Sequence, residues 1–208
     1  MGTTERRARE KEELRRAILD AARDLFAEQG YSAVSLRKIA ERIEYSPTTI
    51  YLYFKDKEEI LRHLIEEGFT MLHDRIMQLS EPNPVQRMRQ GTKCYFEFAF
   101  ENPHYYTLMF QMDDDGVMEI KQTLEVAQRA FGFVRTCVSD AITQGYFRDD
   151  LPEIVQSHIC WAHMHGAVAL HLAGRLSMLP EECVPMFWDN ITEATLIGML
   201  KQAPTPPG

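Results

Sequence analysis

Apolar residues recur along most of this chain at intervals of three and four positions, which is the period of an amphipathic helix. Alternating apolar and polar runs flanked by tight hairpin turns, which are typical of strands, are nearly absent. The pattern therefore predicts an all-α protein with about nine helices. In the first helix, one apolar face is formed by Leu14, Ile18, Ala21, Ala22, Leu25 and Phe26.

Local signals predict where the helices begin and end. Gly30 suits the left-handed residue that closes a helix, and Ser35 suits the N-cap of the next one. Ser46 followed by Pro47 predicts a third helix start, and Asp56 a fourth. Proline and glycine breaks divide the rest of the chain. The expected helices cover residues 5–29, 36–43, 47–54, 56–79, 85–101, 103–110, 117–143, 152–176 and 181–201.

The segment 35–57 predicts two short helices joined by a tight turn. Ile50 and Phe54 are four residues apart and are expected to face inward, so hydroxyl and aromatic side chains face outward. In a helix-turn-helix, the second helix enters the major groove and the first braces it across the DNA backbone. Hydroxyls suit base edges, while tyrosines and lysines suit phosphates. The expected DNA-contacting residues are Ser35, Arg37, Thr48, Thr49, Tyr51, Tyr53, Lys55 and Lys57. The alternative is an ordinary helical hairpin with a solvated polar face.

Charge is distributed unevenly along the 208 residues, whose formal net charge is -8. Residues 1–62 carry 13 Lys and Arg against 12 Asp and Glu, and residues 63–208 carry the other 10 against 19. A nearly neutral N-terminal part with local basic clusters is compatible with phosphate binding, and an acidic body favours solubility. The net charge alone does not exclude a nucleic-acid partner.

One set of residues around this segment has a specific spacing. It comprises Phe26, Gly30, Tyr31, Ser35, Ile39, Ala40, Ser46, Thr49, Ile50, Tyr51, Tyr53, Phe54, Lys57 and Ile60. The spacing resembles the DNA-reading segment of the TetR family of bacterial transcription regulators, over about the first quarter of the chain. The resemblance implies that Pro47 also lies at a DNA-contacting position.

One departure from the family pattern lies in the turn. Glu44 and Tyr45 stand where the family usually has Gly-Val. A turn glycine commonly serves a positive φ, which costs another residue about 1 kcal/mol or more. Either Glu44 tolerates that strain or the turn is reshaped, and its carboxylate could repel a nearby phosphate.

The family resemblance also implies a homodimer formed through the last two helices. Small residues recur on one face of the helix 152–176, which permits close helix approach. The last helix offers an apolar side, and two such helices from each subunit would form an isologous four-helix interface. The expected interface residues are Ala162, Gly166, Ala169, Ala173, Phe187, Ile191, Ala194 and Ile197. The alternative is that these faces pack within one subunit.

The same resemblance implies a small-molecule effector held in the C-terminal bundle. Aromatic and sulfur-containing residues are dense there, and such residues line pliable apolar pockets as well as ordinary cores. The expected pocket residues are Phe96, Phe100, Tyr106, Met109, Phe110, Phe131, Met164 and His165. The run from Trp161 to Gly166 resembles a motif of one C-terminal subtype of the family, whose ligands the sequence does not give.

Other chemistry finds little support in the sequence. His158 and His165 share a helix face, but no metal-binding helix motif surrounds them, and Asp113–Asp115 lacks the spacing of a calcium loop. No catalytic constellation or phosphate-cradling glycine loop stands out, so we expect no catalytic residues, metal or cofactor. The four cysteines form no C-x-x-C pair, and no segment suits a membrane span or a secretory signal, so we expect a cytoplasmic protein with reduced thiols.

Together these patterns predict three parts of the chain. Residues 1–60 are expected to form a three-helix DNA-binding domain, 61–202 a larger helical bundle for effector binding and dimerisation, and 203–208 a disordered tail. The expected function is a ligand-responsive transcriptional regulator that binds a palindromic operator in double-stranded DNA as a homodimer. We expect the protein to repress transcription and to be released from the operator by a small, largely apolar effector. The alternatives are an effector-independent DNA-binding protein, or a helical metal- or ligand-binding protein with a vestigial DNA-binding domain.

Overall fold

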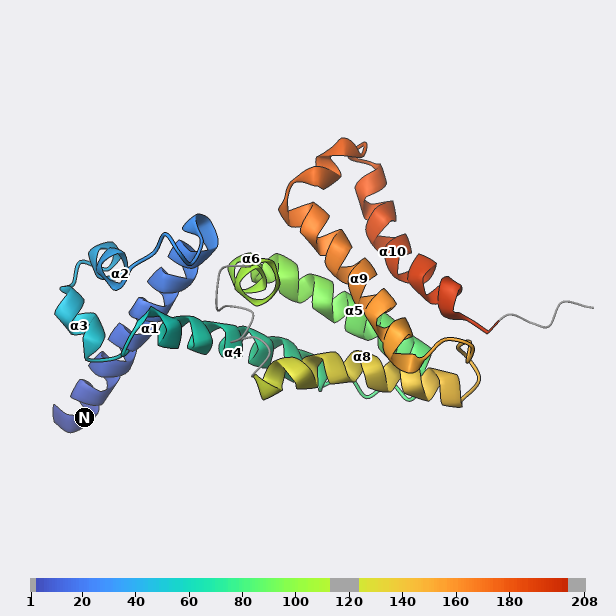
Figure 1. Ribbon diagram of the computed structural model, residues 1–208, viewed down its shortest axis with the longest axis horizontal. Coiled ribbons are helices and arrows are strands. Elements are labelled where there is room, and N and C mark those ends of the chain that lie inside the picture. Colours follow the sequence, from blue (N-terminus) through green and yellow to red (C-terminus); the bar gives the residue numbers. More distant parts are fainter. Residues whose placement is uncertain (1–2, 113–123, 202–208) are drawn as a thin grey trace, which may run out of the picture. The chain divides into compact units, whose positions relative to one another are not determined.

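The computed structural model describes residues 3–112 and 124–201 (Figure 1). Within these ranges it contains nine α-helices and no strand, which confirms an all-α fold with about nine helices. No helix within these ranges combines the length and the apolar character needed to cross a membrane. The helices are α1 (Thr3–Gln29), α2 (Leu36–Arg42), α3 (Pro47–Tyr51), α4 (Lys57–Ile76), α5 (Pro84–Glu101), α6 (Pro103–Tyr106), the π-helix η1 (Thr107–Gln111), α8 (Glu125–Thr143), α9 (Glu153–Leu172), the 3-10 helix η2 (Arg175–Met178) and α10 (Cys183–Met199).

The chain divides into two compact units, which we describe separately. Unit one comprises residues 1–71 and 102–127, and unit two comprises residues 72–101 and 128–208. Unit one therefore contains α6 and η1 in addition to the helices of the N-terminal segment. The expected division by role, at residues 60 and 202, remains a prediction, and the expected tail lies outside the described residues.

Several helices are shorter than their sequence pattern predicts. Helix α3 ends at Tyr51 rather than Phe54, because the following backbone folds into tight turns with Tyr53 N donating to Ile50 O at 2.9 Å. The helix expected to reach residue 176 stops at Leu172, and Gly174 with a φ of 68° precedes η2. The helix expected over 103–110 starts as α6 and widens into η1, where Met112 N donates to Thr107 O. Of the helix expected over 117–143, residues 117–123 lie outside the described part.

The core of unit one is built from the apolar faces that the periodicity predicts. Ile18 and Phe26 on α1 are fully buried, as are Ile39 on α2 and Ile50 on α3. Each such side chain contributes about 1.5–3 kcal/mol when it leaves water. Helix α2 contacts α1, and α3 contacts α2 (Figure 1). The buried face of α1 therefore holds α2 directly, and α3 follows next to α2.

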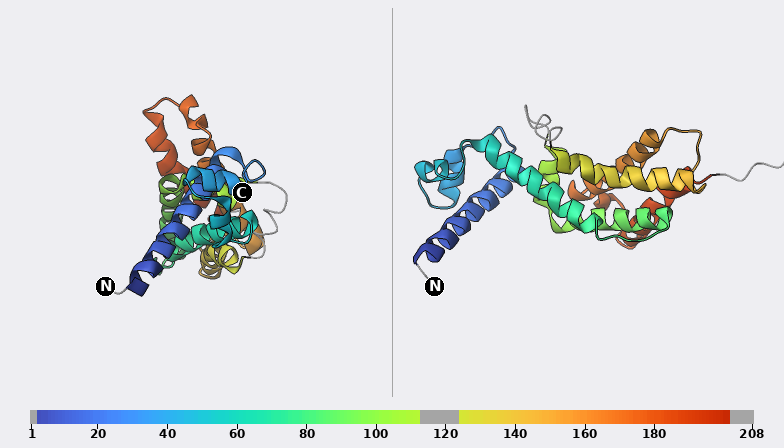
Figure 2. Two further views of the ribbon diagram at one scale, coloured as in Figure 1. Left: turned by 90° about the vertical axis from the view of Figure 1, so that its left-hand side faces the viewer. Right: turned by 90° about the horizontal axis from the view of Figure 1, so that it is seen from below.

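Unit two is built from α5, α8, α9 and α10, and Figure 2 shows α5 and α8 running side by side. They are antiparallel, since Arg87 pairs with Asp140 while Gly91 lies against Phe133. A Cβ on Gly91 would lie 2.3 Å from Cε1 of Phe133, so the glycine permits this close approach. The ion pair joins the start of α5 to the end of α8, and the Gly91–Phe133 contact joins their middles.

All four cysteines are free thiols, and two of them are buried in unit two. Burial raises the pKa of Cys160 to about 12, so its thiol stays protonated at neutral pH. The Cys160 Sγ lies 3.1 Å from the Sδ of Met199. The thiol therefore serves as a small apolar group between α9 and α10.

Candidate nucleic-acid interface and effector cavity

The two short helices of unit one begin where the sequence predicts. Ser35 is the N-cap of α2, and its Oγ accepts a hydrogen bond from Lys38 N at 3.3 Å. Ser46 is the N-cap of α3, with Pro47 at the first helical position, and its Oγ accepts from Thr49 N at 3.2 Å. These caps satisfy backbone donors at both helix starts.

Helix α3 presents a polar and aromatic outer face. Ile50 is fully buried, while Thr48 is exposed and Tyr51 is 60% exposed. Thr49 and Tyr53 are only half-buried, and the Oγ1 of Thr49 lies 3.0 Å from the Oγ of Ser46. Thr48 and Tyr51 are therefore the side chains of α3 most available to a groove.

The structure adds two exposed apolar residues to the predicted DNA-contacting set. Leu52, directly after α3, is 75% exposed, and Tyr45, directly before its cap, is 49% exposed. Apolar groups at such positions suit thymine methyls and sugar edges. The sequence contained a signal for Leu52. Only Ile50 and Phe54 were expected on the inner face of the helix predicted over 47–54, so Leu52 belonged to its outer face.

The predicted phosphate-binding side chains differ in the contacts that they make within the protein. Lys55 is exposed and lies 3.9 Å from Asp56, and Arg37 is exposed but pairs with Glu41 at 2.8 Å. The Nζ of Lys57 donates to Tyr31 O at 3.0 Å and to Val34 O at 3.1 Å. With two of its three N–H groups used this way, the Lys57 ammonium braces the connection between α1 and α2. A phosphate contact by Lys57 remains a prediction, and at most one N–H of its ammonium group is left to make it.

The turn between α2 and α3 is strained at Glu44. Its φ is 61°, the only positive φ at a non-glycine position in the described residues. The next residue, Tyr45, donates its N–H to Ala40 O at 2.9 Å, which closes the end of α2. Of the two possibilities left by the sequence, the turn keeps its left-handed geometry and Glu44 bears the strain.

We predict that Glu44→Gly stabilises the protein by about 0.5–1 kcal/mol. A left-handed conformation costs a side-chain-bearing residue about 1–2 kcal/mol, which glycine would not pay. The greater freedom of glycine in the unfolded chain offsets about 0.5–1 kcal/mol of that gain in stability. Chemical denaturation measures the change. Glu44→Gln is the matched control, because it removes the charge but keeps the strain and should leave the free energy of unfolding unchanged. Equal stabilisation by both variants would assign the effect to charge instead.

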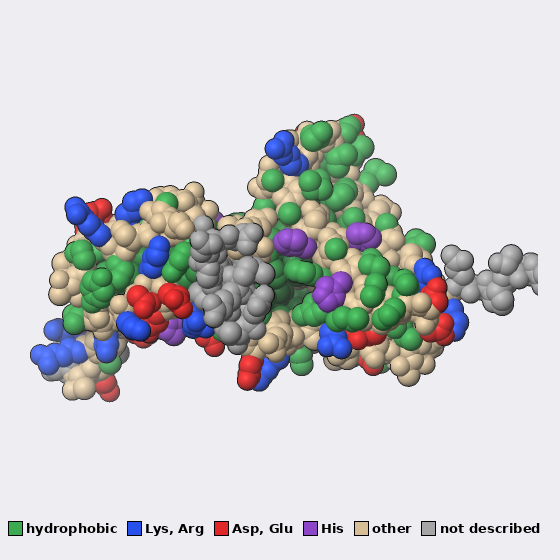
Figure 3. Space-filling view, viewed as in Figure 1, with side chains coloured by type: hydrophobic (Ala, Val, Ile, Leu, Met, Phe, Trp, Pro, Cys, Tyr) green, Lys and Arg blue, Asp and Glu red, His purple; other side chains and the backbone are tan. Residues whose placement is uncertain are grey.

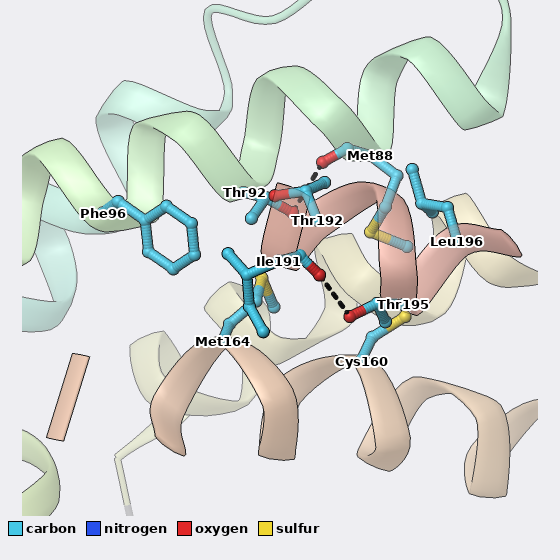
Figure 4. Close-up of a pocket in the computed structure, with 9 residues that line it drawn as sticks. All are labelled: Met88, Thr92, Phe96, Cys160, Met164, Ile191, Thr192, Thr195 and Leu196. Carbon is cyan, nitrogen blue, oxygen red and sulfur yellow. Dashed lines mark hydrogen bonds between the residues drawn. The ribbon is translucent and has the colours of Figure 1, made fainter. Parts of the chain in front are cut away.

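A small cavity lies in unit two between α5, α9 and α10 (Figure 4). Two of its lining residues, Phe96 and Met164, belong to the predicted effector pocket, and Ile191 belongs to the predicted dimer interface. None of the lining side chains is charged. The lining residues are Met88, Thr92, Phe96, Cys160, Met164, Ile191, Thr192, Thr195 and Leu196.

The polar groups of this cavity are largely satisfied from within the protein. The Oγ1 of Thr92 donates to Met88 O at 3.0 Å, and the Oγ1 of Thr195 donates to Ile191 O at 2.9 Å (Figure 4). The Oγ1 of Thr195 also lies 2.9 Å from Nδ1 of His163. The cavity surface is therefore apolar and sulfur-rich, and is suited to a neutral, apolar group.

Two other groups of predicted pocket residues in unit two lie in aromatic clusters. The ring of Phe100 lies 4.6 Å from that of His171 and 4.9 Å from that of Trp188. The Trp188 ring is also 4.9 Å from the ring of Phe96, which lines the cavity. Sequence reasoning missed Trp188 and His171, although both lie on helices with dense aromatic content.

The second cluster joins α8 to α9. The Phe131 ring lies 4.9 Å from His158 and 6.1 Å from Trp161, and the ring of His165 lies 5.6 Å from Trp161. These four side chains are exposed or half-buried. Phe131 and His165 are thus connected by the indole of Trp161, which contacts both rings.

The remaining predicted pocket residues lie in unit one. Tyr106 and Met109 are buried, and the Phe110 ring lies 4.9 Å from Tyr106 and 5.4 Å from Phe69. A Cβ on Gly68 would lie 2.6 Å from the Sδ of Met109, so this glycine permits η1 to pack closely on α4. A π-helix is a feature often found near functional sites.

The predicted dimer residues lie on the accessible side of α9 and α10. Ala162, Ala173, Ala194 and Ile197 are exposed, and Gly166, Ala169, Phe187 and Ile191 are half-buried. Large apolar side chains accompany them, with Leu170 47%, Met186 62% and Ile197 67% exposed. Figure 3 shows hydrophobic side chains gathered over these two helices, with histidines between them.

The described residues contain no group of three or more His, Cys, Asp or Glu side chains placed to hold a metal ion. His158 contacts a backbone carbonyl, with its Nδ1 2.7 Å from Ile154 O. The acidic run Asp113–Asp115, which was not expected to bind calcium, lies outside the described residues.

An all-α chain with two capped short helices and an exposed outer face on the second defines a helix-turn-helix regulator. Comparison with protein families agrees. The N-terminal family profile, "Bacterial regulatory proteins, tetR family", matches residues 18–64. The profile "Tetracyclin repressor-like, C-terminal domain" matches residues 88–194. The chain belongs to the TetR family of bacterial transcription regulators, with a helix-turn-helix DNA-binding domain and a ligand-binding C-terminal domain.

Solved structures of similar proteins share the fold. The ketosteroid transcriptional regulator KstR2 of Mycobacterium tuberculosis is 22% identical with a TM-score of 0.71, covering 90% of this chain and 95% of that chain. The transcriptional regulator FadR of Bacillus subtilis, solved in complex with stearoyl-CoA, is 18% identical with a TM-score of 0.72, covering 88% and 98%. The fatty acid degradation regulator FadR of Bacillus halodurans is 19% identical with a TM-score of 0.69, covering 88% and 94%.

Proposed function

We propose that the protein is a non-enzymatic repressor that binds a palindromic operator as a homodimer and leaves it when a small apolar effector binds. The observation that carries the DNA-binding part is the outer face of α3. Thr48 and Tyr51 project from a helix whose opposite side, at Ile50, is fully buried. Such a face holds hydroxyl and aromatic groups in place for base edges and phosphates.

The homodimer is supported by the apolar surface of α9 and α10. Ile197, Met186 and Leu170 leave much of their surface in water in the single chain. A Cβ on Gly166 or Gly198 would meet no other atom within 4 Å, so close approach of another helix is sterically open there. Helix-turn-helix proteins that bind as twofold dimers contact half-sites about 34–36 Å apart.

The apolar effector is supported by the uncharged cavity between α5, α9 and α10. Relatives with this fold include one solved with stearoyl-CoA and one that is named a ketosteroid regulator. An acyl chain or a sterol skeleton matches an uncharged lining that includes two methionines, a phenylalanine and two aliphatic side chains. We therefore propose a ligand whose buried part is an acyl chain or a fused-ring hydrocarbon.

The cavity location supports a two-state mechanism of release. Two of its three helices, α9 and α10, carry the proposed dimer surface, and Ile191 belongs to both. A ligand that binds one dimer spacing better than the other shifts the population toward that spacing. To change a protein population from mostly DNA-bound to mostly released, the ligand must bind the released spacing about 10⁴-fold more tightly than the DNA-binding spacing.

The test begins with selection of sequences from a random double-stranded DNA pool by the full-length protein. We expect a palindrome whose half-sites are one helical turn apart, bound by two chains. Stearoyl-CoA and a ketosteroid are then titrated against the complex, and one of them should release the DNA. Binding without sequence preference would overturn the repressor proposal, and selective binding that neither probe changes would leave an effector-independent DNA-binding protein.

We predict that Met164→Trp weakens release of the DNA by the effector while DNA binding is retained. Met164 is 7% exposed and lines the cavity, so an indole there fills the space that a ligand would occupy. The overpacking should cost about 1–3 kcal/mol of stability. The probe concentration needed for release should rise at least about tenfold, measured by fluorescence anisotropy of labelled operator. Met77→Trp, at a residue 63% exposed, is the control and should respond as the wild type does.

A further inference from the structure

Unit one contains a polar cluster away from the outer face of α3, which we call the Tyr105 cluster. It consists of Arg16, Asp20 and Arg23 on α1, Glu67 on α4, and Tyr105 on α6. Neither the predicted DNA contacts nor the proposed effector cavity includes any of these side chains. Charged groups of both signs thus meet where three helices come together.

The hydroxyl of Tyr105 is the meeting point. It donates to Oε2 of Glu67 at 2.6 Å and accepts from Nη2 of Arg16 at 2.9 Å. The Nη1 of Arg16 donates to Oε1 of the same Glu67 at 2.5 Å. Tyr105 is 6% exposed, and burial raises the pKa of its hydroxyl, with the hydrogen bond to Glu67 acting in the same direction. The hydroxyl therefore remains a donor at neutral pH.

The rest of the cluster sets the position of the two arginines. Asp20 accepts from Nη2 of Arg16 at 2.6 Å and from Nη1 of Arg23 at 2.8 Å. The guanidinium of Arg23 lies 5.3 Å from the centre of the Tyr105 ring. Two successive turns of α1 therefore hold the Tyr105 side chain, its hydroxyl through Arg16 and its ring through Arg23.

Two neighbouring contacts strengthen the same junction. His104, the residue before Tyr105, places its Nδ1 2.9 Å from Oδ1 of Asp24 on α1. Gly68, the residue after Glu67, allows the Tyr105 ring so close that a Cβ there would lie 3.2 Å from its Cδ1. Helix α6 is thus joined to α1 by two side chains and packed against α4.

We propose that Tyr105 and Glu67 are positioning residues for DNA reading, which rests on the proposed function. Helix α1 contacts α2, and α2 contacts α3, so a change in the orientation of α1 is passed on to α3. The Tyr105 cluster holds α1 to α4 and α6. When the cluster is broken, α1 samples more orientations, and DNA binding must restrict that freedom at a cost in affinity.

The test uses Tyr105→Phe and Glu67→Gln in the full-length chain, with DNA selected by the wild type. Both variants should bind the selected DNA at least about fivefold more weakly, in the range of typical coupling between sites. Affinity for random-sequence DNA should stay within twofold, because the cationic groups facing phosphates are unchanged. Hydrogen exchange should show faster amide exchange in residues 16–24 in both variants.

The control separates positioning from loss of stability. Ile65→Val trims a fully buried residue of α4 outside the cluster, so it should lower the melting temperature without changing affinity for the selected DNA. Two variants are used so that poor folding of one leaves the other informative. Affinity of both variants within twofold of the wild type, or tighter binding, would overturn the positioning role alone. Failure of the wild type to select any sequence would overturn the proposed function and this inference together.

Discussion

The double variant Thr48→Ala with Tyr51→Ala is expected to lose at least about 100-fold in affinity for the selected operator. Both side chains leave the outer face of α3 while Ile50, on its inner face, stays fully buried. Each specific contact is worth about 1–3 kcal/mol, and a dimer loses both contacts in each half-site. Electrophoretic or anisotropy titration against operator and random DNA at one salt concentration measures the loss.

Two features make this result interpretable. The N-cap hydrogen bond from Thr49 N to Ser46 Oγ is untouched by either substitution, so α3 should keep its start. Tyr146→Ala removes a tyrosine that is 42% exposed in unit two and should leave DNA affinity unchanged. Affinity of the double variant equal to that of the wild type would show that α3 does not read DNA.

Ile197→Glu is expected to convert the proposed homodimer to a monomer at micromolar concentration. Ile197 is 67% exposed on α10, within the surface that we propose two chains share. Burying an unpaired carboxylate in an apolar interface costs several kcal/mol, which corresponds to an increase of at least about 100-fold in the dissociation constant. Sedimentation velocity measures the assembly state.

The same variant should also bind the full palindrome poorly, because each half-site is then contacted by an independent chain. Met77→Glu is the matched control, since Met77 is 63% exposed but lies outside α9 and α10. It should remain a dimer with unchanged DNA affinity. A dimeric Ile197→Glu would place the interface elsewhere on the molecule.

Helix starts were predictable from sequence where the determinants are local. Ser46 and Pro47 act on the adjacent backbone, so the start of α3 agrees with the prediction. Its end was placed three residues too late, because the backbone after Tyr51 folds into tight turns rather than continuing as a helix. At Glu44 the sequence predicts either strain or a reshaped turn, and the φ of 61° at this residue shows that the turn is strained.

Long-range contacts explain most of what the sequence did not show. The Lys57 ammonium is held by carbonyls of Tyr31 and Val34, which are more than 20 positions earlier, and helical periodicity contains no signal for such a contact. The cavity is lined by residues from three helices. The density of aromatic and sulfur-containing residues along the chain therefore predicted only Phe96 and Met164 as pocket residues among its lining. The Tyr105 cluster likewise joins α1 to residues 51 and 89 positions away.

The division of α3 into an inner and an outer side has a consequence for how such a protein diversifies. Substitutions at Thr48 and Tyr51 change groups that face solvent, whereas the helix is anchored through Ile50. Under the proposed function, new operator preferences are therefore accessible through single replacements that leave the packing of α3 intact. The same property makes these two positions the natural starting library for engineering an orthogonal genetic switch.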